Sequence, residues 1–141
     1  MTYIIRDAKP SEFETIGQLM VTVYAQLDGF PKPNEQPKYY HMLAHIGEWT
    51  KKPEVRLLVA VDTNGKVGGG VVYFGNMQYY GSGGTAKFEQ QAAGFRLLAV
   101  ATEARGKGLG RQLSASCVDI ATKEGKKKVV IHSTKAMQVA W

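Results

Sequence analysis

Residues 98–111 read Leu98-Ala99-Val100-Ala101-Thr102-Glu103-Ala104-Arg105-Gly106-Lys107-Gly108-Leu109-Gly110-Arg111. An apolar run leads here into a basic, glycine-rich turn and then into an amphipathic segment, which predicts a buried strand, a loop and a helix. Glycines let the backbone approach a ligand closely, and the amides and dipole of a helix N-terminus attract anions. The stretch therefore predicts a phosphate-binding loop at residues 105–111, in preference to a glycine-rich turn whose charges serve only solubility.

Two common phosphate-binding motifs do not match this loop. A P-loop requires a glycine five residues before Gly106, where the chain has Ala101, and Ser or Thr after Lys107, where it has Gly108. The dinucleotide fingerprint requires a third glycine where the chain has Arg111. The sequence thus favours neither ATP hydrolysis nor NAD binding.

The residues before this stretch predict one strand, two helices and a hairpin. Residues 3–6 form an apolar strand, and a helix follows over 11–27, with Ser11 and Glu14 as a capping box. The spacing of apolar residues predicts a second helix over 36–50. Asn64-Gly65 between two β-branched runs favours a type I′ hairpin turn. The glycines at 68–70 predict a bulge or a close backbone approach in the second strand of this hairpin.

The residues from position 93 onward predict a third long strand over 93–100, a helix and a last short strand over 129–131. The helix carries Leu109, Leu113, Cys117 and Ile120 on one face and ends at Glu124-Gly125. Cys117 is interpreted as a buried structural thiol, since no base lies near it in the sequence. Residues 75–91, which include Gly81-Ser82-Gly83-Gly84, are expected to form a mobile connection.

Composition limits the class of protein. With 141 residues, of which 44% are hydrophobic, the chain fits one domain over 1–141. Its longest apolar runs are too short to cross a bilayer, and no secretory signal is recognised at its start, so we expect a cytoplasmic protein. One cysteine provides neither a disulfide nor a zinc cluster, so no metal is expected. The net charge of +6 favours an anionic ligand, although nucleic acid remains the less favoured partner because no nucleic-acid-binding motif is present.

The glycine-rich stretch resembles the signature Q/R-x-x-G-x-G/A of the GNAT superfamily of acetyl-CoA-dependent N-acetyltransferases. Arg105 to Gly110 matches it completely, and Leu98-Ala99-Val100 precedes it at the usual spacing. The resemblance implies an α+β fold in which helices flank a mixed, mainly antiparallel central sheet. It also implies acetyl-CoA as co-substrate, with its pyrophosphate on the loop and its pantetheine arm along the signature strand. The implied cofactor-binding residues are Leu98, Ala99, Val100, Arg105, Gly106, Lys107, Gly108, Leu109, Gly110 and Arg111.

The resemblance implies an amine acceptor that attacks the thioester directly in a ternary complex. Residues of the first two helices and their loop would wall the acceptor site: Tyr24, Asp28, Phe30, Tyr39 and Tyr40. Candidate proton acceptors are Glu89, Glu103 and His132, although Glu103 is also read as a surface acid and His132 as a solvent-facing histidine. Lysines 126–128 are read as a solvated charge run at the helix end.

The chain departs from the family pattern at its C-terminal end. The family usually continues with a helix that carries a tyrosine for protonation of the leaving thiolate, and with further strands, whereas this sequence ends at Trp141. The fold is therefore expected to be C-terminally shortened. Either a homo-oligomer or strand exchange covers the open edge at residues 129–131, or the chain is a truncated form with impaired catalysis. The alternative function is a non-catalytic acyl-CoA-binding module.

Overall fold

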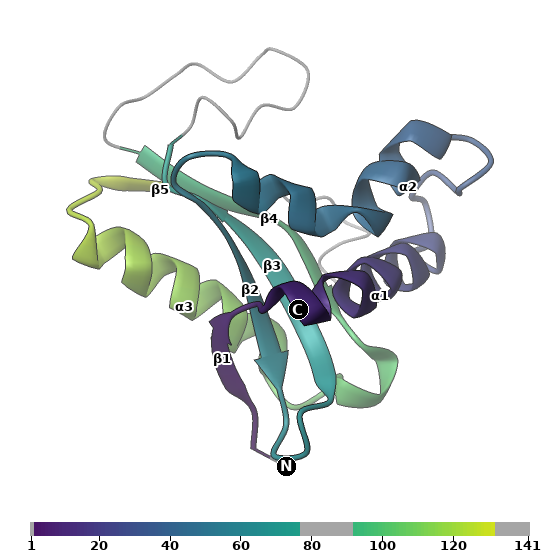
Figure 1. Ribbon diagram of the computed structural model, residues 1–141, viewed down its shortest axis with the longest axis horizontal. Coiled ribbons are helices and arrows are strands. Elements are labelled where there is room, and N and C mark those ends of the chain that lie inside the picture. The colour runs from purple at the N-terminus through teal and green to yellow at the C-terminus, as the bar shows by residue number, and fades with distance from the viewer. Residues whose placement is uncertain (1, 77–91, 132–141) are drawn as a thin grey trace.

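A five-stranded mixed sheet forms the centre of the molecule (Figure 1). The computed structural model describes residues 2–76 and 92–131. The strands lie in the order β1-β2-β3-β4-β5; neighbours among the first four are antiparallel, and β4 and β5 are parallel. Their bounds are β1 Ile4–Asp7, β2 Val55–Val61, β3 Val67–Phe74, β4 Ala92–Val100 and β5 Lys128–Ile131. The predicted α+β fold with a mainly antiparallel sheet is confirmed.

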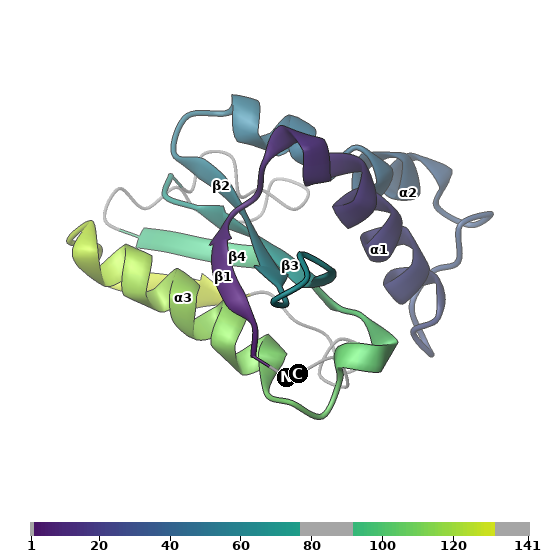
Figure 2. The ribbon, with the colours of Figure 1, turned by 60° about the horizontal axis from the view of Figure 1, so that its bottom comes forward.

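Helices cover both faces of this sheet (Figures 1 and 2). The helices α1 Phe13–Ala25 and α2 Pro37–Ala44 pack on one face, and α3 Leu109–Lys123 packs on the other. The three central strands are therefore buried on both sides, which explains why their sequences are continuously apolar instead of alternating. Cys117 lies fully buried in the α3 layer, as predicted.

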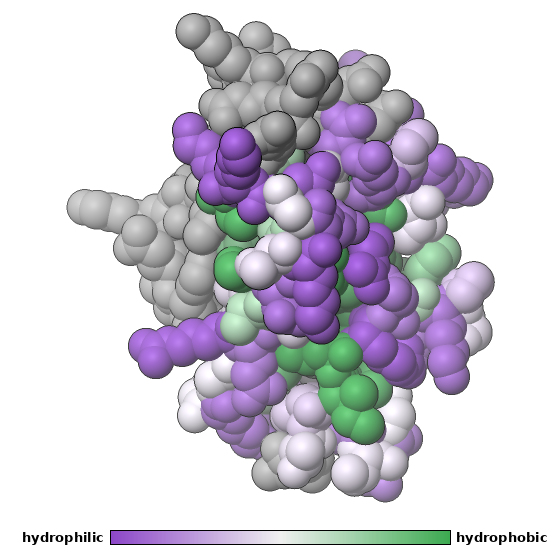
Figure 3. Space-filling model, turned by 90° about the vertical axis from the view of Figure 1, so that its left-hand side faces the viewer, coloured by the Kyte–Doolittle hydropathy of each residue, from purple (hydrophilic) through white to green (hydrophobic). Residues whose placement is uncertain are grey.

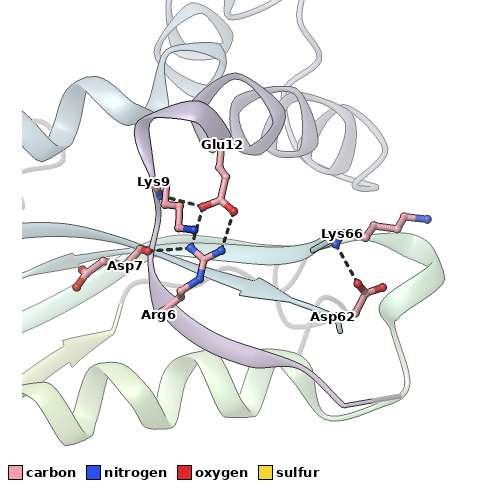
Figure 4. Close-up of polar contacts among 6 residues, drawn as sticks. All are labelled: Arg6, Asp7, Lys9, Glu12, Asp62 and Lys66. Carbon is pink, nitrogen blue, oxygen red and sulfur yellow. Dashed lines mark hydrogen bonds and ion pairs between the residues drawn. The ribbon is translucent and has the colours of Figure 1, made fainter. Parts of the chain in front are cut away.

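The start of the first helix differs from the prediction. A short 3₁₀ helix, η1 Pro10–Glu12, precedes α1, and the capping carboxylate is Glu12 instead of Glu14. Glu12 accepts the amide of Lys9 at 2.8 Å and two N–H groups of Arg6 at 2.9 and 2.8 Å (Figure 4). Pro10 explains the shift, because its fixed φ suits the first position of a helical turn. The Ser11–Glu14 capping box is therefore wrong, and the α-helix begins two residues later than expected.

The predicted helix over residues 36–50 is divided in two. The α-helix α2 ends at Ala44, and a 3₁₀ helix, η2 Ile46–Lys51, continues the chain. At the break, the Nδ1 of His45 lies 2.9 Å from the carbonyl oxygen of His41. Ile46 is fully buried after this change of direction, so tertiary packing overrides the continuous helical periodicity.

The hairpin of β2 and β3 is confirmed, but its turn is not type I′. Asn64 is not among the residues with positive φ, whereas Gly65 has φ +81° and donates its amide to the carbonyl of Asp62 at 3.0 Å. The buried Asp62 carboxylate also accepts the amide of Asn64 at 2.8 Å and the amide of Lys66 at 2.9 Å. Figure 4 shows the bond to Lys66. These side-chain bonds stabilise a turn with only one left-handed residue.

The glycines of β3 allow the close approach that the sequence predicted. A Cβ on Gly69 would lie 2.9 Å from the carbonyl oxygen of Ala99 and 3.1 Å from the side chain of Leu113. A Cβ on Gly68 would lie 2.6 Å from the ring of Tyr3. The predicted bulge is also present: the pairing of β2 with β3 shifts between Ala60 and Val61, and Gly68 is the extra residue on β3. The first turns of α3 therefore sit directly on β3.

The outer surface is largely hydrophilic on the side where α3 and β1 lie (Figure 3). Among the described residues, the large apolar side chains that are exposed are Ile4 and Val118. No helix in the described ranges is both long and apolar enough to span a bilayer.

Candidate functional site

The loop between β4 and α3 has the backbone conformation that its glycines permit. Gly106 and Gly108 have φ of +79° and +75°, in the left-handed region that residues with a Cβ rarely adopt. A Cβ at either position would meet no heavy atom within 4 Å. These glycines are therefore required for backbone conformation and leave open space beside the loop.

The amides of residues 106–111 form an uninterrupted set of donors. Within residues 2–76 and 92–131, none of these six N–H groups has a hydrogen-bond acceptor, and the first bond of the helix runs from the Gln112 amide to the Gly108 carbonyl at 3.0 Å. The first amides of a helix carry partial positive charge. Lys107 and Arg111 are exposed beside them, and the half-buried Arg105 donates its Nε–H to the Val100 carbonyl at 3.4 Å. This arrangement can bind an anion with several oxygen atoms.

Neighbouring elements hold the loop in place. The short 3₁₀ helix η4 Thr102–Ala104 begins the loop, and the Ala101 amide donates to the Gly68 carbonyl of β3 at 2.8 Å. Ala104 is 1% exposed and anchors the loop in the α3 layer of the core. Glu103 is exposed and lies 3.7 Å from Lys66 of the β2–β3 turn. Its interpretation as a surface acid agrees with this position.

A bulge interrupts β4 just before the signature residues. Val72 of β3 pairs with Arg96 and Gly70 pairs with Ala99, so Leu97 and Leu98 together face one residue of β3. Leu97 has φ +62°, which is rare for a residue with a branched side chain. A bulge of this kind leaves one residue outside the ladder of hydrogen bonds and changes the directions of the side chains near it.

Beyond the bulge, β4 has a backbone edge facing away from β3. In the described part of the chain, β5 pairs with β4 only from Ala92 to Phe95. Leu98, Ala99 and Val100 are buried and lie between this pairing and the loop at residue 105. An extended ligand with amide groups can pair with such an edge as an additional strand does.

Four of the five predicted acceptor residues lie together on the α1 and α2 face. The ring centroids of Tyr24 and Phe30 are 5.3 Å apart, those of Phe30 and Tyr39 are 5.8 Å apart, and those of Tyr39 and Tyr40 are 6.0 Å apart. We call these four residues the tyrosine cluster. Asp28 is exposed and makes no hydrogen bond or ion pair with any described residue, so the geometry does not bring it into the cluster.

Tyr24 connects the tyrosine cluster to the signature strand. Its side chain is fully buried, and its hydroxyl donates a hydrogen bond of 3.0 Å to the carbonyl of Leu98. Burial raises the pKa of Tyr24 well above its usual value, so the hydroxyl stays protonated and remains a donor. The cluster therefore lies directly over the bulge.

Arg96 is a residue of this site that the sequence analysis missed. It is half-buried within β4, between buried neighbours, and lies beside the hydroxyl of Tyr39. Arg96 could have been found from the sequence, because it is a charged residue inside an otherwise apolar strand. The positive φ of Leu97 had no such signal in the sequence.

The remaining candidates take no part in the described site. Glu89 and His132 lie outside the described residues. Burial raises the pKa of the Cys117 thiol to about 12, which agrees with a structural role. Among the residues described, no group of three or more metal-ligating side chains is present.

Solved structures with this fold come from several organisms. A transcriptional regulator from Bacillus halodurans is 21% identical, with a TM-score of 0.65, over 99% of this chain and 87% of that one. A putative acetyltransferase from Pyrococcus furiosus is 20% identical, with a TM-score of 0.68, over 98% and 89%. Glucosamine-6-phosphate N-acetyltransferase from Arabidopsis thaliana is 17% identical, with a TM-score of 0.63, over 99% and 87%. At these identities the likeness shows a shared fold.

The comparison with family models gives a more specific result. The model described as the acetyltransferase (GNAT) family matches residues 20–141, which is most of the chain. No curated protein matches the sequence.

Proposed function

This chain belongs to the GNAT acetyltransferase family, and we propose that it transfers the acetyl group of acetyl-CoA to a primary amine of a small molecule or protein. The observation that carries the proposal is the set of six consecutive amides at residues 106–111, which lack an acceptor in the described residues and lead into the first turn of α3. The family uses acetyl-CoA as co-substrate, and this loop offers its pyrophosphate a binding site.

The donor side of the site offers groups that suit the chemistry of this co-substrate. The pyrophosphate would accept hydrogen bonds from the amides of residues 106–111, with Arg105, Lys107 and Arg111 around it. The pantetheine arm contains two amide groups and would pair with the edge of β4 at Leu98 to Val100. The Leu98 carbonyl already accepts the Tyr24 hydroxyl, so we expect the amide of that residue to contribute to the pairing.

The bulge in β4 provides a place for the reaction. The neutral amine nitrogen would attack the thioester carbonyl carbon, forming a C–N bond, and the carbonyl oxygen would gain negative charge. A backbone N–H left outside the ladder by the bulge can stabilise that oxygen. The C–S bond then breaks, the amine proton passes to a base or to water, and the CoA thiolate takes a proton from solvent.

The base for the amine proton is proposed from the sequence candidates. The side chain of Glu103 is 63% exposed and pairs with Lys66, which favours a role as a surface acid. Glu89 and His132 remain candidates from the sequence alone. We also propose a single domain in the cytoplasm and a homo-oligomer that covers the edge of β5.

Calorimetric titration of the purified chain with acetyl-CoA, CoA and ATP tests the donor side. We expect saturable binding of acetyl-CoA and CoA, and none of ATP. Release of the CoA thiol, followed with a panel of amines, then tests transfer; the name of the Arabidopsis neighbour supports including amino sugars in that panel. Binding without turnover would favour the non-catalytic acyl-CoA-binding module, and a folded chain that binds neither form of CoA would refute the proposal.

A further inference from the structure

The side chain of Tyr24 bonds to β4 at its bulge. Leu97 and Leu98 have no partner in the register of β3 with β4, and within the described ranges β5 pairs with β4 only as far as Phe95. The carbonyl of Leu98 accepts the Tyr24 hydroxyl at 3.0 Å. This bond therefore connects α1 to the part of β4 that both strand pairings leave out.

The bond sets the direction of the backbone at the bulge. A peptide unit is planar, so a hydrogen bond that holds the Leu98 carbonyl holds the whole unit between Leu98 and Ala99. In an extended residue the N–H and the carbonyl point to the same side of the strand, so the Leu98 N–H points to the side on which Tyr24 lies. The proposed thioester, as the last group of an extended arm along β4, would meet that N–H.

The conformation of Leu97 makes such a restraint necessary. Its φ of +62° lies in the left-handed region, and the free energy that this costs is of the same order as the contribution of one hydrogen bond. The buried side chain of Leu97 packs in the α1 layer of the core, and that of Leu98 packs in the α3 layer. The two side chains hold the bulge from opposite faces, and the Tyr24 hydroxyl holds its backbone.

Tyr24 is itself held firmly enough for this role. Its side chain is fully buried, and its ring makes an edge contact with Phe30 at a centroid distance of 5.3 Å and an interplanar angle of 88°. The ring of Tyr39 lies 6.4 Å from it. Since the hydroxyl proton is already bonded to the Leu98 carbonyl, Tyr24 is placed to orient that carbonyl and not to protonate a leaving thiolate.

We propose that Tyr24 is a positioning residue for acetyl transfer, whose hydrogen bond to the Leu98 carbonyl aims the Leu98 N–H at the carbonyl oxygen of the thioester. This inference rests on the proposed acetyl transfer and adds to it a residue of α1 that acts through the backbone of β4. A donor that is fixed before the reaction stabilises the developing negative charge without reorganisation. Loss of the Tyr24 hydroxyl should therefore weaken the transition state more than the binding of acetyl-CoA.

Tyr24→Phe removes the hydroxyl and keeps the buried ring. We expect kcat for acetyl transfer to fall by about tenfold or more, the value of one hydrogen bond to a charged group, and the Kd of acetyl-CoA to change by about twofold or less. Tyr73→Phe is the matched control, because Tyr73 is also fully buried and its hydroxyl donates to Glu124 at 2.7 Å in the other layer of the core. It should lose stability in urea as Tyr24→Phe does and keep the wild-type kcat.

A spectroscopic measurement reports on the thioester itself and requires no turnover. With acetyl-CoA that carries ¹³C at the acetyl carbonyl, the resonance bound to wild-type protein should lie downfield of that of free acetyl-CoA, because the N–H polarises the carbonyl. The resonance should return toward the free value in Tyr24→Phe and keep its wild-type position in Tyr73→Phe. If Tyr24→Phe does not fold, 4-aminophenylalanine at position 24 replaces it. Its weaker N–H donor should move the resonance part of the way, and an unchanged resonance would then overturn the proposal.

Failure of this inference can be told apart from failure of acetyl transfer. If acetyl-CoA binds and its resonance is the same in wild type and Tyr24→Phe, or if kcat falls equally in Tyr24→Phe and Tyr73→Phe, the positioning role is overturned and the transfer is not. If acetyl-CoA binds without turnover, the resonance decides: its loss of shift in Tyr24→Phe alone supports the role. A folded wild type that binds neither acetyl-CoA nor CoA refutes the proposed function and this inference together.

Discussion

Gly108→Ala is the sharpest perturbation of the proposed phosphate loop. Gly108 has φ +75° and open space around its missing Cβ, so alanine would introduce backbone strain and no clash inside the protein. Left-handed backbone costs a residue with a Cβ about 1–2 kcal/mol, which corresponds to a fall in Tm of about 4 °C or more for a domain of this size. The added methyl group would also occupy the space through which a phosphate approaches the amides.

Two other glycines provide matched controls for this strain. Gly29 has φ +78° and Gly65 has φ +81°, and neither would bring a Cβ within 4 Å of any heavy atom. Alanine at all three positions should therefore reduce the free energy of unfolding by a similar amount. Only Gly108→Ala should also weaken acetyl-CoA, by about tenfold to a hundredfold, the value of one hydrogen bond to a charged group. Gly108→Asn should recover part of the stability and keep the binding defect, because Asn tolerates this conformation.

Urea unfolding and calorimetric titration with acetyl-CoA separate the two effects. The reasoning fails if Gly108→Ala loses stability as the two controls do but binds acetyl-CoA with wild-type affinity. It also fails if Gly65→Ala loses as much affinity as Gly108→Ala, because strain alone would then account for the result.

Three further predictions follow from the packing and the titration behaviour of the fold. In an exposed helix, a change from glycine to alanine stabilises by about 1 kcal/mol. Gly17→Ala should instead lower the midpoint of urea unfolding, because the new Cβ would meet the backbone of Ala44. An unchanged or raised midpoint would contradict this packing. The Arg6 guanidinium and the Lys9 amide hold the pKa of Glu12 at about 2. The free energy of unfolding of the wild type should therefore fall between pH 5 and pH 2, and its excess over that of Glu12→Gln should narrow over the same range. An excess that does not change with pH would refute the assignment. Cys117 should react with a thiol reagent only after unfolding, and fast labelling of the folded protein would disprove its burial.

Local signals predicted the loop between β4 and α3 well. Glycine spacing, basic residues and the change from strand to helix all lie within residues 98–111, so the sequence predicts the loop, the helix that follows it and the positive charge around it. The structure confirms the geometry of that loop. The binding of CoA to it stays a prediction.

The parts that the sequence analysis did not predict depend on contacts between distant residues. The left-handed conformation of Leu97 exists because β3 and β4 pair out of register, and no local pattern encodes that offset. The split of the second helix follows from the burial of Ile46 against the sheet. The turn type follows from the Asp62 side chain, which outweighs the preference of Asn64-Gly65 for type I′.

The proposed donor loop and the tyrosine cluster are therefore specified by different kinds of contact. The proposed donor loop is specified by consecutive residues, whereas the tyrosine cluster reaches β4 through a hydrogen bond between Tyr24 and Leu98, which are 74 positions apart. Substitutions in α1, α2 or at Arg96 can therefore change the proposed acceptor wall without altering the backbone of the loop. Acetyl-CoA binding and acceptor choice should accordingly respond to different sets of mutations, with the bulge in β4 as the element that both require.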